Sequence, residues 1–324
     1  MLGHVVRTDG IQPWRLPPET RPFLAPELVN VAEVTSGVRL RFCSDAPAIR
    51  LDLTAFEQPK AFTAPTLQFD LVQSGEIRFT VEAPIDQRSV LEFPLSGCGD
   101  APQEIYFPTR SKAVIHGIHL MRGGFLRPAP DQRPHWITYG SSITQCARAL
   151  HPFHTWPAIA AQRLGWRHTN LGFSGQGKID PMVARTIART PCDRISLCLA
   201  VNTHRSSFST RTWKPAVIGF ISAIRDHHAD VPLLLISPIF SETREETAEL
   251  PGVIGLRQMR EWLEEIVDLF RTHSGDRSIH YLSGLSLIGP DDRHLMPDGL
   301  HPEAEGIRLM GERFAASAPG EWSC

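Results

Sequence analysis

The sequence of 324 residues lacks the features that mark several classes of protein. Its 33 lysines and arginines are balanced by 35 aspartates and glutamates, so the net charge of −2 gives no basic field for a nucleic-acid backbone or an anionic membrane. No apolar run approaches the ~20 residues needed to cross a bilayer. The first residues also lack the pattern of a secretory signal, so a cytoplasmic location is the default expectation.

Cysteine is also scarce. The six cysteines form no CxxC pair and have no zinc-finger spacing. This favours free thiols in a reducing compartment over a framework of disulfides. Hydrophobic residues make up 42% of the chain and charged residues 21%, which is typical of a globular protein.

The first part of the chain shows the two-residue period of β-strands. In "VRLRFCSD" the apolar residues Val38, Leu40 and Phe42 alternate with polar ones, and "AIRLDLTAF" repeats the pattern. The stretch "TLQFDLVQSGEIRFTV" reads as a hairpin that turns at "QSGE". Short strands without helical patterns between them predict an antiparallel β-sandwich or jelly roll over residues 1–126.

A proline-rich segment, residues 127–134, predicts a linker, and the period changes after it. Over residues 135–324 strand-like and helix-like stretches alternate, and "RISLCLAVN" and "VPLLLISPIF" are continuous apolar runs. Such runs suit strands buried on both faces. Alternating strands and helices predict a parallel sheet covered by helices on both faces, a three-layer α/β/α domain.

Small and polar residues follow the predicted strands of this second domain. They occur after "HWITYG", in "GFSGQG", in "AVNTH" and in "DGLHP". The carboxyl ends of parallel strands meet at one edge of a sheet, so these segments are expected to meet in one cleft. Together they supply a serine, a histidine with a nearby aspartate, and donors for an oxyanion, which are the parts of an acyl-transfer site.

Simpler interpretations exist for each of these residues. Ser142 could be the N-cap of a helix, and Asp298 and His301 could form a turn before the last helix. Gly175 could serve only a tight turn, and Asn202 could only bond the end of a strand.

Four segments in order resemble the conserved blocks of the SGNH, or GDSL-like, hydrolases. "YGSSIT" resembles the GDSLT block, with Ser141 in place of its aspartate, and "NLGFSGQG" resembles the second block. "AVNTH" resembles the third block, with Ala200 where the family often has glycine, and "DGLHP" matches the fifth. The resemblance covers about residues 135–317 and implies a flavodoxin-like SGNH fold.

The resemblance also implies roles for individual residues. Ser142 would be the nucleophile, His301 the general base and Asp298 the carboxylate that orients it. The backbone N–H groups of Ser142 and Gly175 and the side-chain amide of Asn202 would form the oxyanion hole. No metal or organic cofactor is implied.

The resemblance further implies an esterase that cleaves small, acetyl-like esters. The N-terminal β-domain is similar to that of carbohydrate esterases, so an acylated carbohydrate or a biosynthetic intermediate is the expected small-molecule substrate. The residues that follow two of the blocks are candidates for the substrate pocket: His154, Trp156, His204 and Arg205. Two alternatives stay open, an acyltransferase that uses an alcohol acceptor and a non-catalytic glycan-binding protein. The sequence does not indicate an oligomeric state.

Overall fold

The structure is a computed structural model that describes residues 3–57, 66–96, 99–205, 208–246 and 253–317. The chain forms two compact units. The first consists of Met1–Pro22, Val29–Gln132 and Ala149–His154, and the second of Phe23–Leu28, Arg133–Arg148 and Thr155–Cys324. The short segment Ala149–His154 therefore belongs to the first unit although its neighbours in sequence belong to the second.

The first unit contains two antiparallel sheets, each with five strands among the described residues. One sheet has the strand order β1 (Gly3–Arg7), β2 (Gly10–Trp14), β9 (Ser111–Leu120), β4 (Ala48–Glu57) and β7 (Arg88–Pro94). The other has the order β10 (Leu126–Pro128), β3 (Arg39–Ser44), β8 (Gln103–Tyr106), β5 (Thr66–Gln73) and β6 (Glu76–Pro84). These strands confirm the predicted N-terminal β-sandwich.

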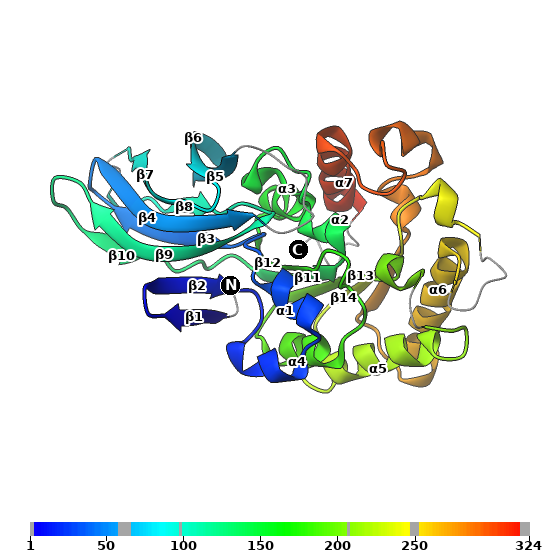
Figure 1. Ribbon diagram of the computed structural model, residues 1–324. Helices are drawn as coiled ribbons and strands as arrows, with labels where there is room; N and C mark the ends of the chain where they lie inside the picture. The colour runs from blue at the N-terminus through cyan, green and yellow to red at the C-terminus, as the bar shows by residue number, and fades with distance from the viewer. Residues whose placement is uncertain (1–2, 58–65, 97–98, 206–207, 247–252, 318–324) are drawn as a thin grey trace. The chain divides into compact units, whose positions relative to one another are not determined.

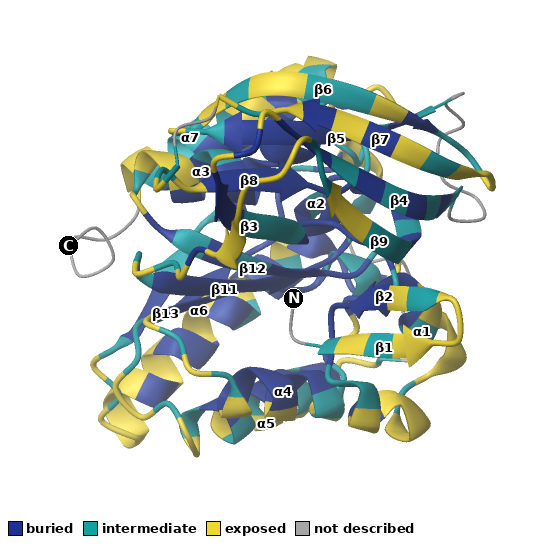
Figure 2. Cartoon of the chain, turned by 90° about the vertical axis from the view of Figure 1, so that its left-hand side faces the viewer, coloured by how far each residue is buried: buried dark blue, intermediate teal, exposed yellow. Residues whose placement is uncertain are grey.

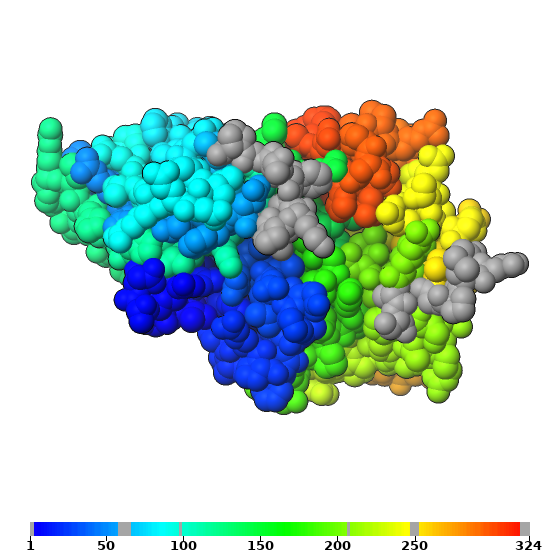
Figure 3. Space-filling view, viewed as in Figure 1, coloured from blue at the N-terminus to red at the C-terminus, as the bar shows by residue number. Residues whose placement is uncertain are grey.

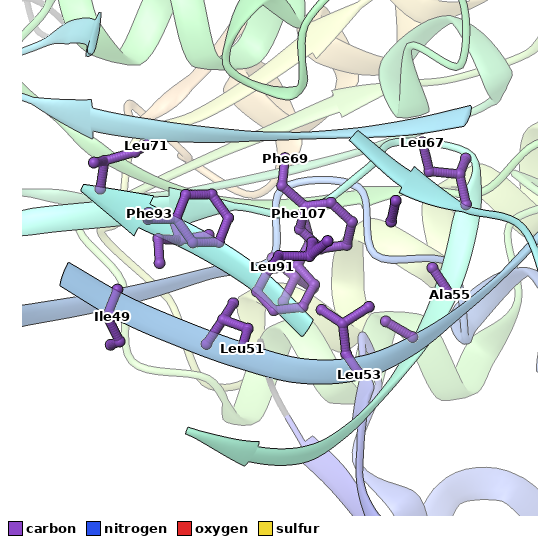
Figure 4. Close-up of a cluster of buried hydrophobic side chains, with 14 of the residues drawn as sticks. Ile49, Leu51, Leu53, Ala55, Leu67, Phe69, Leu71, Leu91, Phe93 and Phe107 are labelled. Carbon is purple, nitrogen blue, oxygen red and sulfur yellow. The ribbon is translucent and has the colours of Figure 1, made fainter. Parts of the chain in front are cut away.

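Alternation along the strands builds the core of this sandwich. In β7 buried Leu91 and Phe93 alternate with exposed residues, which Figure 2 shows as dark blue and yellow bands. The core side chains of β4, β5 and β7 point toward one another in Figure 4. Phe69 and Phe107 meet edge to face with ring centroids 5.2 Å apart, a favourable geometry for aromatic rings.

The second unit has a parallel sheet with the order β12 (Arg167–Gly172), β11 (His135–Gly140), β13 (Arg194–Cys198), β14 (Leu233–Ile236) and β15 (Ile279–Leu282). In chain order this is 2-1-3-4-5, the order of flavodoxin-like sheets. Figure 1 shows α3 (Trp156–Arg163) and α7 (Ala304–Ser317) on one side of the sheet, and α4 (Pro181–Arg189) and α5 (Trp213–Arg225) on the other. Helix α6 (Leu256–His273) packs beside α5. The predicted three-layer α/β/α architecture is therefore confirmed.

Short helices complete the described chain. They are η1 (Pro18–Phe23), α1 (Pro26–Ala32), α2 (Ser142–Gln145), η2 (Pro152–His154), η3 (Val201–Thr203), η4 (Glu242–Arg244), η5 (Gly284–Ser286) and η6 (Pro290–Leu295). Strand β10 pairs with β3, so the first two residues of the predicted linker are in a strand. Among the described residues, no helix combines the length and the apolar character needed to cross a membrane.

Candidate active site

The site lies at the carboxyl edge of the parallel sheet. Strands β11 and β12 run in register to their last residues, Gly140 and Gly172, and the chain after each strand turns out of the sheet. Ser142 follows β11, and Gly175 follows β12. Asn202 lies in η3, four residues after the end of β13. The three segments therefore lie at one edge of the sheet, as expected for loops that follow parallel strands.

The two serines after β11 have different partners. Ser141 is the N-cap of α2, and its Oγ accepts a hydrogen bond from the Ile143 N–H at 3.2 Å. Ser142 is the first residue of the helix, so its own N–H lies in the first turn, where helical N–H groups have no intrahelical acceptor. The capping role that was open for Ser142 thus belongs to its neighbour.

Ser142, His301 and Asp298 form a chain of hydrogen bonds. Ser142 Oγ lies 2.8 Å from His301 Nε2, and His301 Nδ1 lies 2.7 Å from Asp298 Oδ2. A carboxylate only accepts hydrogen bonds, so Nδ1 carries the proton and Nε2 of the neutral ring can accept the serine hydroxyl. The arrangement can take a proton from Ser142 and stabilise the resulting imidazolium.

Asp298 is held as a carboxylate by its own turn. Its Oδ1 accepts the backbone N–H groups of Leu300 at 3.0 Å and His301 at 2.7 Å. Burial alone would raise the pKa of Asp298, but the hydrogen bonds from His301 and Leu300 outweigh it and lower the pKa to about 2. The chain from η6 to α7 reaches the surface, where Figure 3 draws it in orange, and the Asp298 side chain is 36% exposed.

The candidate oxyanion donors are oriented by the same loops. Asn202 Oδ1 accepts the Gly177 N–H at 3.0 Å, which turns the Nδ2 group of the amide away from Gly177. Gly175 has φ +69°, a conformation that favours glycine, and its position is exposed. Both residues can present an N–H group at the sheet edge.

Three buried polar residues, none of them predicted as a site residue, support the loops of the site. Gln145 Oε1 accepts the Ser174 N–H at 3.0 Å, which ties α2 to the loop of Gly175. Asn170 donates to the Thr144 carbonyl at 2.9 Å, and Ser241 donates to the Gly299 carbonyl at 2.6 Å. Asn170 lies in "NLGFSGQG", the segment that resembles the second family block, and this was the available signal for it.

The four candidate pocket residues have different environments. Trp156 is fully buried beside Trp136, and its indole N–H donates to the Ile143 carbonyl at 3.1 Å. It therefore supports the turn of Ser142 from the core, which differs from the expected pocket position. Arg205 is exposed.

The two histidines among those candidates are also placed differently. His204 is buried, and its Nδ1 donates to the Ile254 carbonyl at 2.8 Å; burial lowers its pKa. His154 is exposed and belongs to the first unit. The protein that surrounds part of its ring and the nearby His151 lower its pKa. The ring of His204 is thus fixed by its hydrogen bond to Ile254.

The two described cysteines at the ends of α2 and β13 are not rival nucleophiles to Ser142. Cys146 and Cys198 are free, and burial raises the pKa of each thiol to about 12. Both are therefore protonated near neutral pH, when a thiol is a poor nucleophile. Cys98 and Cys324 lie outside the described residues. In the described part of the chain, no group of three or more His, Cys, Asp and Glu side chains could hold a metal ion.

The fold and the hydrogen-bonded Ser, His and Asp side chains resemble those of α/β serine hydrolases. The sequence profile of the GDSL-like Lipase/Acylhydrolase family matches residues 134–316, more than half of the chain. The protein belongs to this family and is an enzyme of its type. No curated protein matches the chain by sequence.

Solved structures extend the similarity to both units. The salicylyl-acyltransferase SsfX3 from a tetracycline biosynthetic pathway is 29% identical, with a TM-score of 0.89 over 99% of this chain and 94% of that one. A putative GDSL-like lipase from Bacteroides ovatus is 20% identical, with a TM-score of 0.74 over 95% and 91%. A family two carbohydrate esterase from Clostridium thermocellum is 17% identical, with a TM-score of 0.60 over 86% and 90%. The last two similarities concern the fold.

Proposed function

We propose that the protein is a serine esterase that works through an acyl-enzyme on Ser142. The observation that supports this most directly is the hydrogen-bond chain from Ser142 Oγ through His301 to Asp298, at 2.8 and 2.7 Å. A serine hydroxyl is a weak nucleophile near neutral pH, and a base at this distance is what activates it. The proposed substrate is a small-molecule ester, such as an acetylated sugar.

The reaction begins with attack by Ser142 Oγ on the ester carbonyl, while its proton passes to His301 Nε2. The tetrahedral intermediate places its negative oxygen against the N–H groups of Ser142 and Gly175 and the amide of Asn202. The C–O bond then breaks, and His301 returns the proton to the leaving alkoxide. Water attacks the acyl-enzyme with the help of the same histidine, and the carboxylic acid leaves.

An acyltransferase is the second candidate. It shares the acyl-enzyme and differs only in that an alcohol replaces water in the second step. The similarity to SsfX3 favours it, because that acyltransferase matches 99% of this chain at a TM-score of 0.89. By analogy, the acceptor would be a hydroxyl of a sugar or of a natural product.

A panel of chromogenic esters of increasing acyl length tests the proposal, with Ser142→Ala beside wild type. We expect Ser142→Ala to lose at least roughly a thousandfold in kcat, because the acyl-enzyme cannot form. The adjacent Ser141→Ala is the matched control. It removes the cap of α2, costs about 1 kcal/mol of unfolding free energy and keeps the nucleophile.

Hydrolysis that survives Ser142→Ala would overturn the assignment of the nucleophile. Mass spectrometry of products formed with a sugar or phenol acceptor present separates the esterase from the acyltransferase, since only the latter makes a new ester. Failure of a fluorophosphonate to label wild type, under conditions that label a known serine hydrolase, would favour a non-catalytic glycan-binding protein.

A further inference from the structure

Arg148 contacts the Asp298 carboxylate, and it lies outside the four segments that resemble the family's blocks. The Arg148 Nη2 group lies 2.8 Å from Asp298 Oδ2, and Nη1 lies 3.5 Å from Glu303 Oε1. The Arg148 side chain is only 15% exposed, whereas that of Glu303 is 59% exposed. The contact with Asp298 is therefore the shorter and the less exposed of the two.

We propose that Arg148 is a positioning residue for the acyl-transfer reaction, acting through Asp298 on His301. The inference rests on the proposed function, since it takes Asp298 and His301 as the orienting carboxylate and the base. In this role Arg148 binds the Asp298 carboxylate, so it needs no contact with substrate.

The hydrogen bonds around Asp298 explain why a fourth donor matters. The N–H groups of Leu300 and His301 bind Oδ1, and both come from the same turn as the carboxylate. Oδ2 receives the His301 ring at 2.7 Å and Arg148 at 2.8 Å. Arg148 is thus the donor in this set that reaches the carboxylate from outside the turn. Without it, every remaining hydrogen bond of this set comes from the turn that carries His301 itself.

The position of Arg148 in the chain adds a second reason. Helix α2, which begins at Ser142, ends after one turn because Cys146 takes the left-handed conformation, with φ 59°. The chain then reaches Arg148 two residues later. One segment of seven residues, 142–148, therefore carries the nucleophile and the cation that holds Asp298. The contact fixes the position of the His301 turn relative to Ser142. That position sets the distance between His301 Nε2 and Ser142 Oγ, on which proton transfer depends strongly.

The test compares Arg148→Met with wild type in kcat, in KM and in the rate of fluorophosphonate labelling. We expect kcat and the labelling rate to fall together by roughly 10- to 100-fold, the loss that a small misplacement of a catalytic group causes. KM should change less than about threefold, because Arg148 acts on the base rather than on substrate. Arg148→Lys keeps the charge and should recover part of the loss.

Two matched variants separate this role from a structural one. Arg163→Met removes a guanidinium from an ion pair with Glu312, an exposed pair of the same unit, and should leave kcat unchanged. In an Asp298→Asn background, Arg148→Met should lower kcat no further, since its effect passes through the carboxylate. A stability effect alone would lower the melting temperature of Arg148→Met without changing the kcat of the folded fraction.

Failure of the proposed role of Arg148 can be distinguished from failure of the proposed function. If Ser142→Ala and His301→Ala keep wild-type activity, the proposed function is wrong. If those variants are inactive while Arg148→Met stays within twofold of wild type, the function stands and the role of Arg148 is wrong. If Arg148→Met fails to fold, Arg148→Lys decides: a kcat loss that disappears in the Asp298→Asn background supports the proposal, and additive losses overturn it.

Discussion

Ala200 is a residue whose backbone conformation is strained, next to the candidate oxyanion donor Asn202. Its φ of 94° and ψ of −47° lie in a region that residues with a Cβ rarely adopt, and the residue is 1% exposed. Two hydrogen bonds hold its carbonyl, from the Thr203 N–H at 2.7 Å and the Thr203 hydroxyl at 2.6 Å. Surrounding contacts that fix a residue so firmly can maintain local strain.

Replacement of Ala200 by glycine is therefore expected to stabilise the protein. Relief of the strain is worth about 1–3 kcal/mol, and the greater freedom of glycine in the unfolded chain offsets up to about 1 kcal/mol of it. We expect the free energy of unfolding to rise by about 1 kcal/mol, measured by urea unfolding with an unchanged m-value. A lower urea midpoint for Ala200→Gly would contradict the assignment of strain.

The low pKa of Asp298 predicts how its contribution to stability changes with pH. The pKa is lowered from 3.8 to about 2 in the folded protein, so ionised Asp298 contributes its full share of stability above about pH 4. That share is lost as the pH falls toward 2. The difference in unfolding free energy between wild type and Asp298→Asn should shrink over this interval, measured in urea at several pH values. The increment from Ala200→Gly involves no charge and should stay constant; a constant difference for Asp298→Asn as well would contradict the assigned pKa.

At the scale of elements, α2 and the loop after β12 are joined by Gln145. The Gln145 side chain is fully buried, and it accepts a hydrogen bond from the N–H of Ser174, the residue before Gly175. The helix that begins at Ser142 is thus tied to the loop that carries a candidate oxyanion donor.

Gln145→Leu tests this link because leucine keeps the volume and removes the acceptor. The unpaired Ser174 N–H should cost about 1–3 kcal/mol of unfolding free energy. Because the loop of Gly175 loses its anchor, we also expect kcat to fall by roughly tenfold with little change in KM. Steady-state kinetics and urea unfolding measure the two effects. A stability loss without any change in kcat would show that Gln145 does not position the loop.

The elements and the candidate triad could be predicted because their signals are local. Apolar runs at β13 and β14 indicate buried strands, and "DGLHP" holds an aspartate and a histidine three residues apart. Arg148 could not be predicted in the same way, because it meets Asp298 across 150 residues of sequence. The hydrogen bond from Ser241 to Gly299 could not be predicted for the same reason. The hydrophobic period of a segment predicts its secondary structure but not its distant partners.

At the scale of the whole molecule, neither unit is a continuous piece of chain. The segment Ala149–His154 joins the first unit, where Phe153 packs edge to face on Tyr106 with ring centroids 5.1 Å apart. Fully buried Asp70 anchors the segment. It accepts the His151 ring at 3.0 Å and the Phe153 N–H at 3.2 Å, together with the Thr80 hydroxyl at 2.8 Å.

Asp70→Asn should therefore lower the stability of the first unit. The amide keeps the shape but replaces one acceptor oxygen by a donor, so a buried partner loses its hydrogen bond at a cost of about 1–3 kcal/mol. Amide hydrogen exchange at Phe153 should accelerate together with this loss. The matched control is Asp52→Asn, which breaks a pair with a largely exposed Arg88 and should cost less than about 1 kcal/mol. Equal costs for the two variants would show that Asp70 does not anchor the segment.

The interrupted course of the chain has a consequence for recombination with relatives. A chimera that exchanges the β-sandwich at a single crossover near residue 132 would leave Ala149–His154 behind, and the incoming β5 would meet a foreign hexapeptide. Two further crossovers, at Arg148/Ala149 and His154/Thr155, would move the hexapeptide with its own sandwich. Thr155 is a suitable junction because its side chain already caps α3. In a working library of chimeras, residues 149–154 would thus come from the same parent as the N-terminal unit, although they lie within the sequence of the hydrolase domain.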